Sequence, residues 1–436
     1  MKIRHQDLEI EEESPFATCQ LNRQRYAEVL TEIVDTYADG FVLAINNEWG
    51  TGKTTFVKMW RQMLSNKGFK TVYFNAWEND FDNDPLTAIV AELKNLTGKN
   101  TEKVYKSIIE KGAAIGKAVL PSALKTLSKG VVDIEAASTA VENLTKAATE
   151  TFDAQIKDYL KKKDSMKGFR TKLEEFVAAT DDEKPIIFII DELDRCRPDY
   201  AVKVLEHLKH FFAVPGIVFA LTIDKGHLAA AVRGFYGTES IDTDEYLRRF
   251  IDLEYSIPSP SSEEFTKYLY SYYEFDQFFT AETRRRIDDF RHDSTNFINM
   301  ASSLFSTGPS TLRQMERIMA RTRLVLNLFR LNNYVFPEVL LLMVYLSTTK
   351  PTLYKKIQKE ELSVQELCDE LEILFLPINT KTRGFLLYVL AEVAGLYQNQ
   401  TGQYGEQLIE RDEKHVTAVE AGRRGERVRI SSRRVL

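Results

Sequence analysis

A stretch of nine residues, 47–55, combines glycines, a lysine and hydroxyl side chains in an order that can bind a phosphate group. It lies between an apolar run typical of a buried strand and a run typical of a helix. Gly50 and Gly52 let backbone amides converge on an anion, and Lys53 adds a full positive charge. The Thr54 hydroxyl can coordinate Mg²⁺. The pattern predicts a P-loop that binds a nucleoside triphosphate through Asn47, Glu48, Trp49, Gly50, Thr51, Gly52, Lys53, Thr54 and Thr55.

One position departs from the usual spacing G-x-x-x-x-G-K-[ST]. Asn47 stands where the first glycine is expected. Asparagine tolerates a left-handed backbone conformation better than most residues do. We therefore expect Asn47 to take that conformation, so that the loop still turns.

A second motif follows a continuous apolar run at residues 186–190 and reads Asp191-Glu192-Leu193-Asp194. The run predicts a central parallel strand whose carboxyl end brings the acidic side chains beside the phosphates. Asp191 is expected to hold Mg²⁺, because a hard cation prefers oxygen ligands. Glu192 is the expected general base for the attacking water, and Asp194 competes for that role. An acidic strand end without catalytic meaning is the simpler alternative.

A further apolar run, residues 217–223, is followed directly by Asp224. Thr222 and Asp224 thus end a strand where related ATPases place a polar residue that senses the γ-phosphate. Asp224 would equally serve as the N-cap of the next helix, and both roles remain open. The guanine-reading signature [NT]-K-x-D is absent here, which favours ATP over GTP.

Composition narrows the class of protein. The chain has 436 residues, enough for two or three domains, and its 44% hydrophobic and 28% charged residues are ordinary for a soluble globular protein. A net charge of −6 argues against broad nonspecific binding of nucleic acid. The three cysteines lie far apart without metal-ligand spacing, which suggests a reducing compartment. No signal peptide and no long apolar segment occur, so we expect a cytoplasmic protein without a transmembrane segment.

Strand signals alternate with helical stretches up to about residue 260 and then stop. This order predicts an α/β fold with a parallel sheet of the P-loop NTPase type, followed by an all-helical domain. The expected regions are a flexible acidic arm (1–14), a nucleotide-binding domain (15–260) with a helical insertion at about 100–165, a helical domain (261–400) and a basic, disordered tail (401–436).

With these motifs in place, the chain resembles the KAP family of P-loop NTPases. Residues 49–54 are similar to the family's W-G-[ST]-G-K-[ST], and residues 74–77 to its F-N-x-W segment. Residues 191–196 are similar to D-D-L-D-R-C, with glutamate at the second position. The resemblance covers residues 15–260 and extends thinly to residues 309–317.

The resemblance implies hydrolysis of ATP with Mg²⁺ that drives conformational change or assembly, without fixing a target. Family members often carry transmembrane helices between the two nucleotide motifs. This chain has a charged helical segment in that place, which implies a soluble member. Prokaryotic members are frequently associated with defence against bacteriophage.

Two arginine sites extend the comparison. Arg248 or Arg249, after the fourth strand, would act as an arginine finger in a neighbouring subunit of a homo-oligomer. The alternative is a solvated basic face of a helix. Arg313 resembles the sensor arginine of a helical lid, and its alternative is an ordinary surface arginine.

Three readings of function remain open. Lys53, Thr54, Asp191 and Glu192 together favour an ATPase switch that acts on an unknown protein partner. The others are a nucleotide-binding scaffold that does not hydrolyse ATP, and a peripheral membrane organiser with residues 105–132 as an interfacial helix. The arginine-rich tail offers a contact with nucleic acid or anionic lipid. Nucleic acid is not favoured there, because no aromatic side chains interleave with the arginines.

Overall fold

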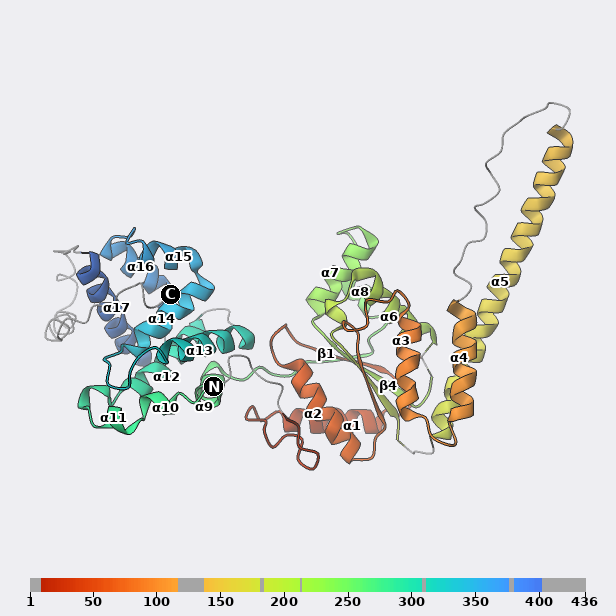
Figure 1. Ribbon diagram of the computed structural model, residues 1–436. Coiled ribbons are helices and arrows are strands. Elements are labelled where there is room, and N and C mark those ends of the chain that lie inside the picture. The colour runs from red at the N-terminus through yellow and green to blue at the C-terminus, as the bar shows by residue number, and fades with distance from the viewer. Residues whose placement is uncertain are drawn as a thin grey trace. The chain divides into compact units, whose positions relative to one another are not determined.

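The computed structural model of the chain describes residues 9–116, 137–180, 184–211, 214–307, 311–375 and 380–401. The described residues form two compact units that divide after Pro258 (Figure 1). A parallel sheet with helices makes up the first unit, and the second contains helices. The predicted fold class is therefore confirmed.

Five parallel strands form the sheet, in the order β2-β3-β4-β1-β5. Their bounds are β1 (Val42–Asn46), β2 (Thr71–Asn75), β3 (Ile186–Asp191), β4 (Ile217–Ile223) and β5 (Leu253–Tyr255). The sequence predicts a longer last strand, 251–257. Only its middle pairs with β1, where Leu253 and Tyr255 lie opposite Leu43 and Ile45.

The two central strands explain how the motifs meet. Every residue of β3 and β4 is buried, as expected for β-branched runs covered on both faces of a parallel sheet. Since β4 lies between β1 and β3, the carboxyl ends of these three strands share one edge. Asp191 of β3 lies opposite Thr222 of β4, and Asn46 of β1 lies opposite Ile223. The loops that follow β1, β3 and β4 therefore lie side by side.

Helices cover both faces of this sheet. On one face α1 and α2 pack together, and α2 contacts β2 and β4. On the other, alternate strand side chains such as Phe74, Phe188 and Leu221 share a buried cluster with α3, α5 (Ala137–Ala179), α6 and α7. The bounds are α1 (Gln24–Thr36), α2 (Lys53–Asn66), α3 (Pro85–Glu92), η1 (Leu93–Leu96), η4 (Leu193–Arg195), α6 (Pro198–Phe211), α7 (Lys225–Tyr236) and α8 (Thr243–Leu247).

The insertion between β2 and β3 is formed by α4 (Glu102–Gly116) and α5 (Ala137–Ala179), which pack side by side (Figure 1). α5 continues past the predicted end at residue 165. The reason is that Phe169, Leu173 and Phe176 belong to the buried cluster beneath the sheet. Among the described residues, no helix has the length and hydropathy needed to span a membrane.

The second unit is built from short and medium helices. Their bounds are α9 (Ser262–Tyr272), α10 (Asp276–Phe279), α11 (Glu282–Arg285), η5 (Asp288–Phe290), α12 (Asp293–Thr307), α13 (Leu312–Leu326), α14 (Pro337–Thr349), α15 (Pro351–Gln358), α16 (Val364–Phe375) and α17 (Thr380–Thr401). Three expectations concern residues outside the described part of the chain. They are the first eight residues of the acidic arm, residues 117–132 of the interfacial helix and residues 402–436 of the basic tail.

Arg284 is a fully buried cation of the second unit. It forms an ion pair with Asp293 and donates hydrogen bonds to the carbonyl oxygens of Leu331 (3.1 Å) and Asn333 (2.9 Å). We expect Arg284→Ala to lower the free energy of unfolding by about 3–5 kcal/mol, because a buried carboxylate would lose its counter-charge. Chemical denaturation measures this. Arg286→Ala, which removes an exposed ion pair, should change the free energy far less. Equal losses would contradict the expectation.

Candidate nucleotide site

The loop between β1 and α2 has the backbone conformation of an anion cradle. Gly50 and Gly52 have φ angles of 83° and 80°, a left-handed conformation that glycine adopts without steric cost. α2 begins at Lys53, directly after Gly52, so its unpaired amino-terminal amides belong to the loop. A phosphate group suits such a concentration of amide donors at a helix start.

The Lys53 side chain reaches back over this loop. Its ammonium donates hydrogen bonds to the carbonyl oxygens of Asn47 and Glu48, the latter at 3.3 Å. Partial burial lowers the pKa of Lys53, while the carboxylates of Asp194 and Asp224 oppose this effect. The ammonium thus lies among loop carbonyls, and phosphate oxygens can replace these as its partners.

Asn47 does not have the left-handed conformation that we expected from its place in the motif. Its side-chain amide instead forms two hydrogen bonds with the backbone of Ile257: Nδ2 donates to the carbonyl at 2.7 Å and Oδ1 accepts from the amide at 2.9 Å. The Asn47 amide also donates to the Ile223 carbonyl at 3.1 Å. These contacts anchor the start of the loop to the chain beyond β5, so a left-handed residue is not needed there.

Arg23, which precedes α1, is a site residue that no sequence motif indicates. Its guanidinium donates to the carbonyl oxygens of Thr51 (2.7 Å) and Gly52 (3.2 Å). Arg23 is almost fully buried, which lowers its pKa, and among the described atoms its Nε has no partner. Because the N–H of a planar peptide points away from its C=O, binding these carbonyls turns the amides of Gly52 and Lys53 to the opposite side. Arg23 thus orients part of the amide cradle.

Hydrogen bonds orient both oxygens of the Asp191 carboxylate. Oδ2 accepts from the Tyr73 hydroxyl at 2.8 Å, and Oδ1 accepts from the Glu192 amide at 2.9 Å and from the Thr222 hydroxyl. Burial and the Asp191 charge raise the pKa of Tyr73, so the phenol remains a donor. An oriented carboxylate suits Mg²⁺, which proteins often hold by few ligands together with nucleotide phosphates. The described residues contain no group of three or more His, Cys, Asp or Glu side chains that could hold a metal alone.

The two candidate bases have different surroundings. Glu192 has a left-handed backbone, with φ of 61°, and forms an ion pair with Arg195 at 2.5 Å. Burial raises the pKa of Glu192, and the Arg195 charge opposes this effect. Asp194 uses one oxygen, Oδ2, to accept from the Trp49 indole Nε1 and from the Asp224 amide at 2.9 Å. Asp194 therefore connects the P-loop, the acidic motif and the end of β4, which favours Glu192 as the base.

Asp224 is the N-cap of α7. Its Oδ1 accepts from the amides of Gly226 (3.1 Å) and His227 (3.2 Å). Its Oδ2 accepts from the Trp49 amide at 3.2 Å, so the cap also contacts the P-loop. The polar side chain of β4 that contacts Asp191 is that of Thr222.

The predicted arginines lie at the surface of their units. Arg248 and Arg249 follow α8 and are exposed, and Arg248 pairs with Glu245 of α8 at 3.6 Å. Arg313 lies in the first turn of α13, in the second unit, and is exposed. Arg248 and Arg249 are therefore accessible to another molecule.

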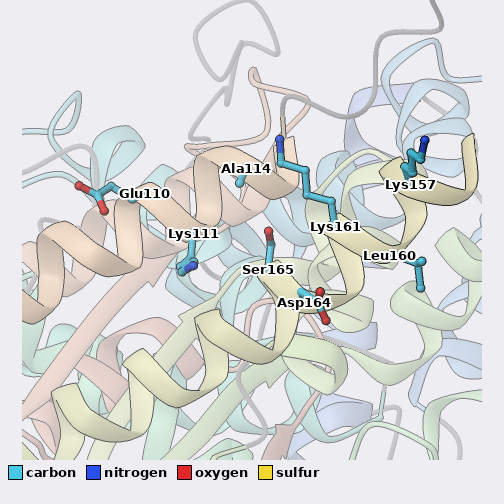
Figure 2. A pocket seen from close by; sticks show the side chains of 8 residues that line it. All are labelled: Glu110, Lys111, Ala114, Lys157, Leu160, Lys161, Asp164 and Ser165. Atoms are coloured by element: carbon cyan, nitrogen blue, oxygen red, sulfur yellow. The ribbon is translucent and has the colours of Figure 1, made fainter. Parts of the chain in front are cut away.

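A pocket of the first unit lies between α4 and α5 (Figure 2). Charged side chains from both helices line it, including Lys111, Lys161 and Asp164. The P-loop and the acidic motif contribute no residue to this pocket. It is therefore separate from the candidate nucleotide site.

Known proteins offer two comparisons. A family model described as the KAP family P-loop domain matches residues 23–329, a range that contains both motifs and α13. Among solved structures, the chain is similar to that of the ORC2 protein of Aeropyrum pernix in ADPNP-ADP complexes, with a TM-score of 0.37 and 13% sequence identity. That similarity covers 92% of this chain and 86% of the other. No curated protein matches the chain.

Proposed function

Because the chain belongs to the KAP family of P-loop NTPases, we propose that it hydrolyses ATP with Mg²⁺ to drive a conformational or assembly switch. One observation carries the proposal: the P-loop and the acidic motif are joined by side-chain hydrogen bonds. Trp49 of the P-loop donates to Asp194, and Thr222 donates to Asp191 from the strand between them. Phosphates bound to the loop would then lie beside oriented carboxylates.

The binding roles follow from the chemistry of each group. The amides around Gly50 and Gly52 and the Lys53 ammonium would bind the β- and γ-phosphates. Thr54 and Asp191 would hold Mg²⁺ through oxygen, directly or through water. When bound, Mg²⁺ neutralises charge on the phosphate oxygens.

Glu192 would accept the proton of the attacking water. The water oxygen forms a bond to the γ-phosphorus, the bond from that phosphorus to the bridging oxygen breaks, and ADP leaves with the electron pair. The products are ADP and inorganic phosphate, with the water proton on Glu192. The pKa of Glu192, which burial raises, suits this role, because a stronger base accepts the proton more readily.

A switch requires that the presence or absence of the γ-phosphate changes the structure at the protein surface. Asp224 contacts the Trp49 amide and caps α7, and α7 packs against α8, which is followed by the exposed Arg248 and Arg249. We therefore assign these arginines to the site of a second copy in a homo-oligomer, where one of them would contact the γ-phosphate. If no arginine acts between subunits, Arg313 of the same chain is the candidate to supply the positive charge at the γ-phosphate.

Glu192→Gln is expected to reduce hydrolysis by roughly a hundredfold or more while Mg·ATP affinity is retained, because an amide binds water but cannot take its proton. Phosphate release and calorimetric titration on the same preparation measure the two quantities. Asp194→Asn is the matched comparison: it weakens the contacts to Trp49 and Asp224, so nucleotide affinity should fall together with the rate. A selective loss of rate in Asp194→Asn alone would reassign the base. A wild-type protein that binds ATP without hydrolysing it would support the scaffold reading.

A further inference from the structure

Arg195 contacts three side chains around the acidic motif. Its Nη1 lies 2.5 Å from Oε1 of Glu192. Its guanidinium carbon lies 5.8 Å from the ring centroid of Trp49 and 5.7 Å from that of Trp77. These distances are in the range of cation–π contacts, so one cation links the candidate base to two aromatic rings.

The two rings have different surroundings. The Trp49 indole donates to Asp194 and stacks on His227, with ring centroids 3.6 Å apart and planes 6° apart. Trp77 follows β2 in a turn where its backbone amide donates to Oδ1 of Asn75 at 3.1 Å. The Arg195 guanidinium therefore contacts a fixed ring of the P-loop and a ring carried by the hydrogen-bonded turn after β2.

The Glu192 side chain depends on such support. Its backbone has a left-handed conformation, and the side chain is a flexible one with several rotatable bonds. The ion pair, which Arg195 makes with the Oε1 atom, restricts the carboxylate. We propose that Arg195 is a positioning residue that holds the Glu192 carboxylate for proton transfer, with Trp49 and Trp77 as its aromatic support. This inference rests on the proposed function.

The charges around Glu192 are of both signs. Asp191 and Asp194 raise the pKa of Glu192 in addition to burial, whereas Arg195 and the Asn75 side chain lower it. The Arg195 cation therefore stabilises the ionised carboxylate, which is the form that accepts a proton.

The first experiment compares Arg195→Gln and Arg195→Lys with the wild-type full chain. In Arg195→Gln, kcat should fall about tenfold or more with the Mg·ATP dissociation constant little changed, because the base loses its orientation while the phosphate contacts remain. Arg195→Lys should restore part of the rate. Lys203→Gln, which removes a cation from the partly exposed Lys203–Asp199 pair on α6, is the matched control and should leave both quantities unchanged. An unchanged kcat in Arg195→Gln, or a loss of affinity as large as the loss of rate, would overturn the proposal.

The second experiment does not need hydrolysis. Trp49 and Trp77 are exposed, whereas Trp60 is buried, so tryptophan emission at one fixed pH reports on the rings that contact Arg195. We expect the emission of Arg195→Gln to differ from that of wild type and the emission of Lys203→Gln to be the same. Equal emission in wild type and Arg195→Gln would overturn the aromatic support. A difference in emission in a chain without ATPase activity would uphold the contact and refute hydrolysis.

Discussion

Lys53→Ala is expected to reduce ATP affinity by roughly a hundredfold or more, because the loop keeps its amides but loses the full positive charge at the phosphates. The structure supports this loss, since the Lys53 ammonium is the cation that lies over the carbonyls of Asn47 and Glu48, inside the loop. Isothermal titration with Mg·ATP measures the change. Retained micromolar affinity in a folded variant would contradict the P-loop interpretation.

Two controls separate binding from folding. Lys67→Ala removes an exposed lysine just beyond the other end of α2 and should leave the affinity unchanged. Thermal unfolding of Lys53→Ala without nucleotide should stay close to wild type, because its hydrogen-bond acceptors at Asn47 and Glu48 are only partly buried or exposed. Added Mg·ATP should then stabilise wild type and Lys67→Ala, but not Lys53→Ala, since only a bound ligand raises stability.

The second large effect concerns Arg248 and Arg249. If one of them enters the site of a second copy, its replacement by alanine should lower kcat by roughly a thousandfold or more with ATP binding retained. Specific activity of the wild type should also rise with protein concentration, because the finger is present only when subunits meet. Steady-state rates across a dilution series, with sedimentation at the same concentrations, measure both.

A mixing experiment tests the arrangement directly. The finger variant keeps a complete P-loop, and Lys53→Ala keeps the arginine, so a mixture should recover part of the activity that each lacks. Arg233→Ala is the control, because it removes a cation of α7 that pairs locally with Glu239. If specific activity does not change on dilution and is not recovered on mixing, the arginine that contacts the γ-phosphate belongs to the same chain as the P-loop. Arg313 is then the next residue to replace.

Several properties of the protein could be predicted from short segments. The apolar runs that became β3 and β4 predict central strands by composition alone, because a strand covered on both faces needs no polar residue. The P-loop conformation is also local, since Gly50 and Gly52 stand at the two left-handed positions. The family was likewise predicted from contiguous motifs, and the family model confirms it.

Other properties depend on contacts that no segment contains. Arg23 binds the Thr51 carbonyl across 28 residues, Trp49 binds Asp194 across 145, and Asn47 binds Ile257 across 210. The interpretation of Asn47 was wrong for this reason. A residue type limits the backbone conformations that are available, but a distant partner decided which one this loop uses.

Short motifs therefore predict which groups offer the chemistry for phosphate and metal, because glycine, lysine, hydroxyl and carboxylate groups are carried by neighbouring residues. The tertiary structure decided the partners of the two candidate carboxylates. Asp194 and Glu192 are two positions apart and equal in charge. Because of the order of the strands, Asp194 accepts hydrogen bonds from Trp49 and Asp224. Glu192 instead forms an ion pair with Arg195. A hydrogen bond requires its donor within about 3 Å in a defined direction, and only the packed sheet fixes that distance.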